Sequence, residues 1–202
     1  GYRTGKYSVN AETGAKDFVE VPKLGEPHVV LQVFLKYGPD GEKVIAWYAK
    51  AAPGQPTILY FHGNAGSLAA RYERVRKFHA SGRGMLMMTY RGYGGSTGHP
   101  SERANVADAG LAYDLLIREG VRPRDIILFG ESLGTGVAVQ IAASREIGGL
   151  IMDSPYTTMV ETAALHYPWL TVGMLLLDRY ESMRYIDRLR APLLVLHGER
   201  DV

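Results

Sequence analysis

The sequence contains no cysteine, and this absence excludes several kinds of chemistry. Without thiols the chain can form no disulfide framework, offers no thiolate nucleophile and cannot ligate a metal through sulfur. The absence of cysteine does not identify the cellular compartment, because a periplasmic protein can also lack cysteine.

A strong excess of charge of one sign is missing as well. Lys and Arg number 23 against 21 Asp and Glu, which leaves a formal net charge of +2. Because the basic residues are also dispersed, the composition argues against nucleic acid as a partner. Neither an H-x-x-x-H motif nor a cluster of carboxylates indicates a metal, so we predict no metal and no cofactor.

Long hydrophobic runs are scarce. Residues 162–177 carry no Asp, Glu, Lys or Arg, but the run includes Pro168 and is short of the roughly 20 residues that cross a bilayer. The opening GYRTGKYS has no apolar core of a signal peptide. The sequence therefore shows neither a signal nor a transmembrane segment.

The clearest structural signal is the stretch DIILFGESLGTGVAVQ, residues 125–140. Its residues 126–129 are apolar on both faces, as in the central strand of a parallel sheet. They run into Gly130-Glu131-Ser132-Leu133-Gly134, the G-x-S-x-G pattern of a nucleophile elbow, a sharp turn that exposes the serine hydroxyl above the sheet. With a strand before it and a helix after it, we interpret the pattern as an elbow rather than an ordinary turn, with both glycines giving strand and helix room to pass closely.

Strands and helices alternate around this stretch. We predict buried strands at 57–61, 84–89, 149–152 and 192–196, with helices between them, and this alternation indicates a mostly parallel sheet covered on both faces. Residues 29–37 and 44–49 alternate in polarity around a Gly-Pro-Asp-Gly turn, which predicts an antiparallel hairpin at one edge. We predict no regular structure for residues 1–28.

A segment at about 154–185 breaks the alternation, and we interpret it as a small cap after the sixth strand. Its apolar side chains could line an acyl pocket, although packing of a buried helix in the core is a nearly equal alternative. These side chains are Trp169, Leu170, Val172, Met174, Leu175 and Leu176. We predict a single domain over residues 1–202.

The glycine-rich stretch YRGYGGSTG, residues 90–98, invites a nucleotide-binding interpretation. Its spacing is not G-x-G-x-x-G, however, and no Lys-Ser or Lys-Thr pair follows it. We therefore predict a tight loop beside the site rather than a phosphate cradle.

Four motifs in this order resemble one family. FHGNAG, YRGYGGSTG, FGESLG and LHGERD are similar to the motifs of the α/β-hydrolase superfamily, in its serine-hydrolase branch. Within it the sequence looks most like the lysophospholipase-like and serine-aminopeptidase-like hydrolases, many of which carry an amino-terminal membrane anchor. The resemblance extends from about Ile58 to the end of the sequence and implies the α/β-hydrolase fold.

The resemblance also implies roles for individual residues. Ser132 corresponds to the nucleophile, the backbone N–H groups of Leu133 and Asn64 to the oxyanion hole, and Asp201 to the acid that orients the catalytic histidine. Asp153 stays open as a rival acid, because some members of the superfamily place theirs after the sixth strand. We interpret His62 as a residue that organises its turn rather than as the base.

One part of the family's pattern is missing. The fold orders its triad as Ser, then Asp or Glu, then His, and no histidine follows Asp201 in this sequence. We therefore expect the sequence to be incomplete at its carboxyl end, without the last strand, the base and a closing helix. The 202-residue chain itself should then have little triad activity.

The sequence thus predicts a serine hydrolase that cleaves carboxylic, acyl-bearing esters of small or lipid-like molecules through an acyl-enzyme on Ser132. Amide or thioester cleavage by the same machinery is the nearest alternative. A non-catalytic binding module is a further one, should the protein natively lack the histidine. We predict a cytoplasmic or membrane-associated protein, with membrane association through an upstream anchor or the apolar cap left open, as is the oligomeric state.

Overall fold

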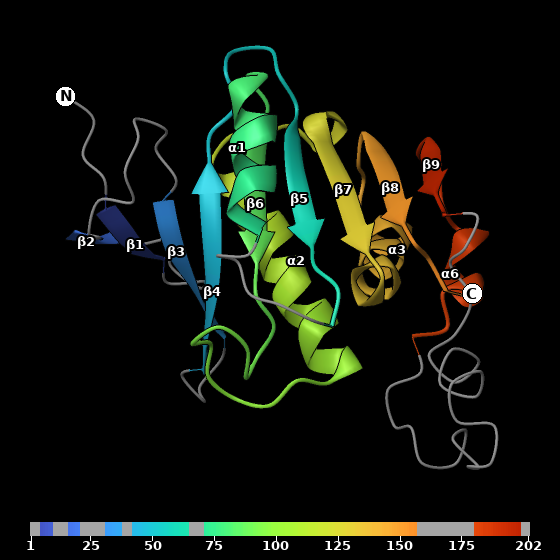
Figure 1. The fold of residues 1–202 in the computed structure, drawn as a ribbon, viewed down its shortest axis with the longest axis horizontal. Helices are drawn as coiled ribbons and strands as arrows, with labels where there is room; N and C mark the ends of the chain where they lie inside the picture. Colours follow the sequence, from blue (N-terminus) through green and yellow to red (C-terminus); the bar gives the residue numbers. More distant parts are fainter. Residues whose placement is uncertain are drawn as a thin grey trace.

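The computed structural model describes residues 5–9, 16–20, 31–37, 42–64, 71–156 and 180–198. Its strands and helices alternate along most of the chain (Figure 1). In chain order they are β1 (Gly5–Val9), β2 (Lys16–Glu20), β3 (Leu31–Tyr37), β4 (Glu42–Ala49), β5 (Thr57–Phe61), α1 (Tyr72–Ala80), β6 (Gly84–Met88), α2 (Glu102–Arg118), the 3₁₀ turn η2 (Pro123–Asp125), β7 (Ile126–Glu131), α3 (Leu133–Ser144), β8 (Gly149–Asp153), α6 (Met183–Ile186) and β9 (Leu193–Leu196).

The described strands form one sheet in the order β2-β1-β3-β4-β6-β5-β7-β8-β9. Strands β6, β5, β7, β8 and β9 run parallel to one another, while β4 is antiparallel to both β3 and β6. The predicted mostly parallel sheet is therefore confirmed, and its parallel half carries the elbow strand β7 between β5 and β8.

The predicted hairpin is present, but its place in the sheet differs from the prediction. Strands β3 and β4 pair antiparallel from Leu31 opposite Tyr48 to Tyr37 opposite Glu42. They do not form the edge, because β1 lies parallel to β3 and β2 lies antiparallel beyond β1. The prediction that residues 1–28 are irregular is thus wrong for β1 and β2. These strands have only five residues each and several polar ones, so their pairing depends on a neighbouring strand more than on their own pattern.

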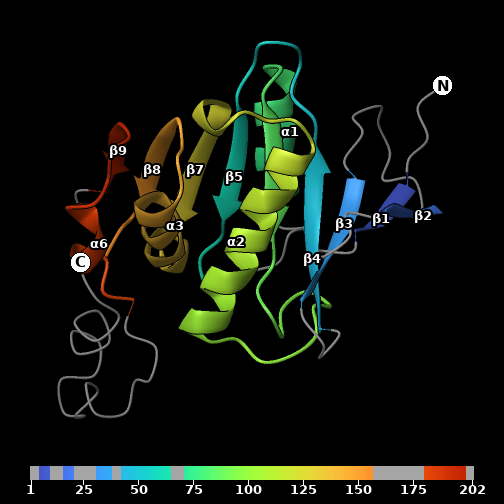
Figure 2. The ribbon, with the colours of Figure 1, turned by 180° about the vertical axis from the view of Figure 1, so that it is seen from behind.

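Helices cover both faces of the sheet. Helix α1 lies in front of it, and α2 and α3 lie behind it (Figures 1 and 2). The buried side chains divide accordingly, because successive residues of a strand point to opposite faces. Val75 of α1 packs with Ile58, Tyr60, Met85, Met87 and Phe129 on one face. Leu116 of α2 and Val137 of α3 belong to the larger core on the other face, with Leu59, Phe61, Leu86, Met88 and Leu128.

Helix α2 begins after Ser101, which caps it. The Ser101 hydroxyl accepts a hydrogen bond from the N–H of Ala104 at 3.2 Å, as a serine at an N-cap does. The helix ends before Gly120, which has a φ of 87°. Glycine adopts this positive φ with little steric strain, because it has no Cβ. Both ends of α2 are therefore set by local chemistry that the sequence already contains.

The structure describes only the two ends of the predicted cap. At its start, Tyr156 donates a hydrogen bond to the carbonyl of Leu133 at 3.2 Å. At its end, the N–H of Tyr180 donates to Glu102 at 2.9 Å, and the Tyr180 hydroxyl accepts from Asn105 at 2.9 Å. The cap's ends therefore pack against α2 and α3, while residues 157–179, with the predicted acyl-pocket side chains, lie outside the described residues.

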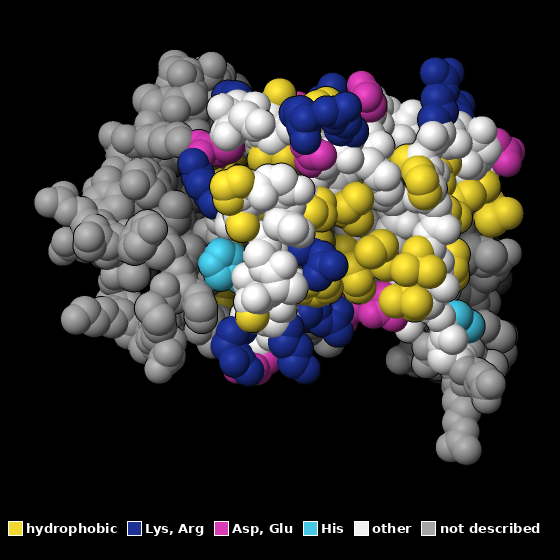
Figure 3. Space-filling view, turned by 90° about the horizontal axis from the view of Figure 1, so that it is seen from above, with side chains coloured by type: hydrophobic (Ala, Val, Ile, Leu, Met, Phe, Trp, Pro, Cys, Tyr) yellow, Lys and Arg dark blue, Asp and Glu magenta, His cyan; other side chains and the backbone are white. Residues whose placement is uncertain are grey.

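The strand predicted at residues 192–196 is present as β9, but the prediction that it is buried is wrong, because β9 is the last strand of the described sheet and pairs on one side only. In strand β9, Leu193 to Leu196 are 41%, 51%, 49% and 42% exposed. Hydrophobic side chains gather on the β8–β9 side of the sheet in the view from above (Figure 3). Among the helices that the structure describes, none combines the length and the apolar character needed to cross a membrane.

Candidate active site

Ser132 occupies the strained junction between β7 and α3. Its φ of 49° and ψ of −115° lie in a region that non-glycine residues adopt rarely and only where the surrounding structure holds them. Its N–H donates to the carbonyl of Asp153 at 2.9 Å, and its carbonyl accepts from the N–H of Thr135 at 2.8 Å. With its backbone held on both sides, Ser132 is exposed at the carboxyl edge of the parallel strands.

Two glycines permit this turn. A Cβ on Gly130 would lie 2.5 Å from the carbonyl oxygen of Gly134, and one on Gly134 would lie 2.0 Å from the carbonyl oxygen of Phe61. Both distances are far inside van der Waals contact. Only glycine lets α3 pass so close to β7 and β5, as the sequence pattern predicts.

The turn after β5, His62-Gly63-Asn64, lies directly against the elbow. A Cβ on Gly63 would be 3.4 Å from the Cβ of Ser132 and 3.4 Å from the carbonyl oxygen of Glu131. Leu133 is the first residue of α3, where backbone N–H groups have no acceptor within the helix. The structure thus brings Ser132, Leu133 and the turn that carries Asn64 together at one place.

His62 is fully buried inside this turn. Its Nδ1 lies 2.6 Å from the carbonyl oxygen of Gly63, so Nδ1 must carry the proton, and its ring packs on Tyr90 with centroids 4.4 Å apart. Burial lowers the pKa of His62, so the imidazole is neutral near pH 7. Within the described ranges Nε2 has no hydrogen-bond partner. These contacts support the interpretation that His62 organises the turn.

Two tyrosines of the glycine-rich loop hold the same turn. The Tyr90 hydroxyl donates to the carbonyl of His62 at 2.8 Å, and the Tyr93 hydroxyl donates to Oδ1 of Asn64 at 2.8 Å. The loop therefore lies beside the site, as predicted, and supports the His62–Asn64 turn. Sequence reasoning missed both tyrosines, because the loop's own residues do not indicate which turn they contact.

Glu131, the residue before Ser132, belongs to an ion-pair cluster that sequence reasoning also missed. Its carboxylate contacts Arg71 at 3.2 Å, Arg74 at 3.3 Å and the hydroxyl of Tyr60. Burial alone would raise the pKa of Glu131, but hydrogen bonds from Arg71 and Tyr60 and the charges of both arginines outweigh it, so this pKa lies below its ordinary value. Glu131 is therefore a carboxylate at neutral pH.

Of the two candidate acids, Asp153 is among the residues that the structure describes and Asp201 is not. Asp201 lies outside the described residues, so its role stays a prediction. The Asp153 carboxylate is 30% exposed and lies 3.8 Å from Nη1 of Arg74, and its backbone carbonyl accepts from Ser132. The contact found for the Asp153 side chain is thus with α1. No group of three or more His, Asp or Glu residues in the described part of the chain could hold a metal ion.

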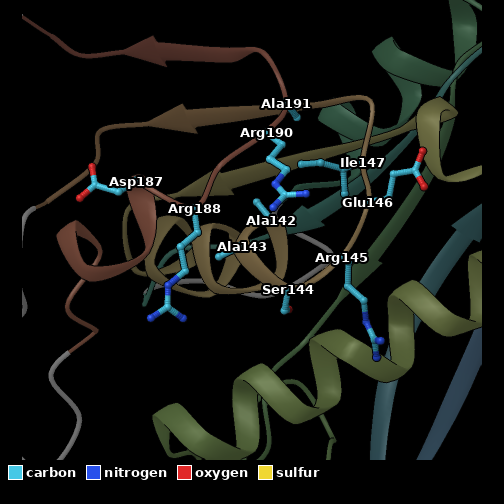
Figure 4. Close-up of a pocket in the computed structure, with 10 residues that line it drawn as sticks. All are labelled: Ala142, Ala143, Ser144, Arg145, Glu146, Ile147, Asp187, Arg188, Arg190 and Ala191. Carbon is cyan, nitrogen blue, oxygen red and sulfur yellow. The ribbon is translucent and has the colours of Figure 1, made fainter.

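A cavity of about 820 Å³ lies away from this site (Figure 4). It is lined by residues 142–147, at the end of α3 remote from Ser132, and by Asp187, Arg188, Arg190 and Ala191, which precede β9. Since a helix rises about 1.5 Å per residue, Ala142 is about 14 Å along α3 from Leu133. The cavity therefore has no part in the elbow site.

A family model described as alpha/beta hydrolase fold matches residues 56–181. The chain therefore belongs to the α/β-hydrolase-fold family, and the resemblance identified from the four motifs is confirmed. The matched range includes β5, the elbow and both described ends of the cap.

Individual relatives are similar over more than three quarters of this chain. An uncharacterized protein of Mycobacterium tuberculosis is 42% identical over 165 residues, which cover 80% of this chain and 59% of that protein. Lysophosphatidylserine lipase ABHD12 of Danio rerio is 31% identical over 176 residues, covering 77% of this chain and 46% of the lipase. The chain thus spans about half of the length of these relatives.

The fold is also seen in a solved structure. The crystal structure of an alpha-beta hydrolase from Vibrio vulnificus superposes with a TM-score of 0.73 at 23% identity, covering 84% of this chain and 64% of the other. At this level of identity the likeness concerns the fold alone.

Proposed function

We propose that the protein is a serine hydrolase that cleaves acyl esters through a covalent acyl-enzyme on Ser132. The observation that carries the proposal is the conformation of Ser132, which is held at positive φ between β7 and α3 and packed against the His62–Asn64 turn. This is the arrangement that a nucleophile elbow requires. Family membership and a relative named as a lysophosphatidylserine lipase support it.

In this mechanism the hydroxyl oxygen of Ser132 attacks the ester carbonyl carbon while a base takes its proton. The N–H groups of Leu133 and Asn64 donate to the oxyanion of the tetrahedral intermediate, and each such donor contributes about 3 kcal/mol. The alcohol leaves with the proton from the base, and water then releases the carboxylic acid and restores Ser132. Asp201 orients the base, an imidazole that follows the acid in this fold.

The acyl class is proposed for the substrate because the described surface near β9 and the segment 162–177 are both apolar, and a long acyl chain is bound through such surfaces. A lysophospholipid is the first natural ester to test, given the activity in the name of the Danio rerio relative. Amides and thioesters test the alternative that the same machinery acts on a different leaving group.

The deciding experiment uses the protein expressed over its full reading frame. Wild type should hydrolyse 4-nitrophenyl acyl esters and be labelled by a fluorophosphonate probe, while Ser132→Ala should lose labelling and at least about 10⁴-fold in kcat/KM. Ser144→Ala is the matched control, since this exposed serine at the end of α3 bonds only carbonyls of its own helix in the contacts found. Equal rates for wild type and Ser132→Ala, or a wild type that neither turns over nor labels, would contradict the proposal and favour a binding module.

A further inference from the structure

The start of α1 meets the carboxyl ends of three strands through charged and polar side chains. Arg71 is the N-cap of α1 and Arg74 lies in its first turn, and Tyr60, Glu131 and Asp153 end or nearly end β5, β7 and β8. We call the pair Arg71 and Glu131, with Arg74 beside it, the elbow clamp.

The contact between Arg71 and Glu131 is bidentate. Nη2 of Arg71 donates to Oε1 of Glu131 at 3.2 Å, and Nε donates to Oε2 at 3.3 Å. The side chains are 12% and 26% exposed, respectively. A guanidinium held by two parallel hydrogen bonds is fixed in orientation as well as in distance, which a single charge contact cannot achieve.

Arg74 extends the contact across the sheet. Its Nη1 donates to the Tyr60 hydroxyl at 2.7 Å and to Oε2 of Glu131 at 3.3 Å, and it lies 3.8 Å from Oδ2 of Asp153. Because β5, β7 and β8 are neighbours in the sheet, one guanidinium touches the ends of all three. These contacts attach the start of α1 to the carboxyl edge of the parallel strands, where Ser132 lies.

The two partners of the clamp are close in sequence to the residues of the proposed site. Glu131 immediately precedes Ser132, and α1 is the first described helix after the turn that carries Asn64. That turn already touches Ser132 through Gly63. The clamp therefore joins the residue next to the proposed nucleophile to the start of α1, which follows the turn with the proposed oxyanion donor Asn64.

We propose that Arg71 and Glu131 are positioning residues, whose bidentate pair keeps the His62–Asn64 turn in register with the elbow. This inference rests on the proposed function. Replacing a partly buried ion pair with apolar side chains often leaves the stability of a protein unchanged. If Arg71 and Glu131 only stabilised the fold, a bidentate ion pair would therefore not be needed. Orientation is different, since a misplacement of about 1 Å can slow an enzyme by about a hundredfold.

A double-mutant cycle over the full reading frame tests the inference. The variants are Glu131→Gln, Arg71→Met and the combination, each assayed for kcat, KM, fluorophosphonate labelling and thermal midpoint, with rates counted per titrated active site. Each single variant should lower kcat by roughly tenfold to a hundredfold with KM little changed. The double variant should be no slower than the slower single one, because both changes remove the same contact.

Arg76→Met is the matched control, because Arg76 lies on the same helix and pairs with the exposed Glu73 one turn away. It should keep the wild-type kcat. Arg71→Lys retains the charge but not the fork, so its kcat should fall between wild type and Arg71→Met, and it replaces Arg71→Met if that variant does not fold.

The outcomes separate the two proposals. An active wild type whose clamp variants lose thermal stability but keep kcat per titrated site would overturn the positioning role and leave the hydrolase intact. A wild type that is neither labelled nor active would overturn both.

Discussion

Helix α3 can pack this closely on the sheet only because Gly134 has no Cβ. A methyl group there would meet the carbonyl oxygen of Phe61 at 2.0 Å, and the carbonyl carbon of the same residue at 2.6 Å. Both atoms belong to the backbone of a central strand and cannot rotate away. Gly110 in α2 offers the contrast, because a Cβ there would find no atom within 4 Å.

We expect Gly134→Ala to destabilise the protein by several kcal/mol or to prevent folding, because overpacking against fixed backbone strains the elbow. Gly110→Ala should instead raise the free energy of unfolding by about 0.5–1 kcal/mol, through the better helix propensity of alanine. Urea unfolding of both variants measures this difference. Similar stabilities for the two would show that the elbow is less tightly packed than the structure has it.

At the scale of elements, the glycine-rich loop after β6 is fastened to α2 by a buried ion pair. Arg91 donates through Nε to Oδ2 of Asp108 at 2.8 Å and through Nη2 to Oδ1 at 2.9 Å. Asp108 is fully buried, and its burial raises its pKa although Arg91 opposes the shift. The same loop presents Tyr90 and Tyr93 to the His62–Asn64 turn, so α2 supports the site through this loop.

Removing Arg91 alone should be costly, because it leaves the Asp108 carboxylate buried without its counter-charge. We expect Arg91→Met to lower the free energy of unfolding by about 3–5 kcal/mol, and Arg91→Met with Asp108→Leu to recover most of that loss. Arg122→Met breaks an exposed pair with Asp125 and should cost less than about 1 kcal/mol. Denaturant unfolding at neutral pH checks all three, and a loss at Arg91 no larger than at Arg122 would contradict the prediction.

At the scale of the molecule, segments far apart in the sequence converge on the carboxyl edge of the parallel strands. Tyr60, Glu131 and Asp153 reach this edge on neighbouring strands, and two arginines at the start of α1 meet them there. This convergence places several charges near Ser132, and it makes the stability of the whole fold depend on the ionisation of Glu131.

The sign of this dependence follows from the lowered pKa of Glu131. In the unfolded chain this carboxyl titrates near 4.5, and in the folded state it titrates lower, because Arg71 and Arg74 favour its charged form. Its contribution to stability is therefore complete above about pH 4.5 and is lost as the pH falls through the folded value. We expect Glu131→Gln to weaken this acid dependence and Ser144→Ala to leave it unchanged. Thermal midpoints measured between pH 6 and 3 test this, and identical profiles for wild type and Glu131→Gln would refute it.

Much of the parallel half of the sheet could be predicted from local patterns. The strands at 57–61, 126–131 and 149–153 are apolar on both faces, and the structure places each within a residue or two of its prediction. Strands β1 and β2 were missed, because five residues of mixed polarity become a strand only beside a neighbour that pairs with them. For the site, the elbow and its two glycines could be predicted, whereas the clamp and the two tyrosines of the loop could not.

The sequence by itself determined the chemistry of the elbow. A serine between two glycines, after a buried strand and before a helix, indicates this turn, and the limit on Gly130 is local because a Cβ there would meet the backbone of Gly134. Only the tertiary structure decided which distant side chains surround it. That Arg71 meets Glu131, 60 residues further along, and that Tyr93 meets Asn64 depend on how strands are ordered and helices packed, and these long-range arrangements leave no trace in any local pattern of residues.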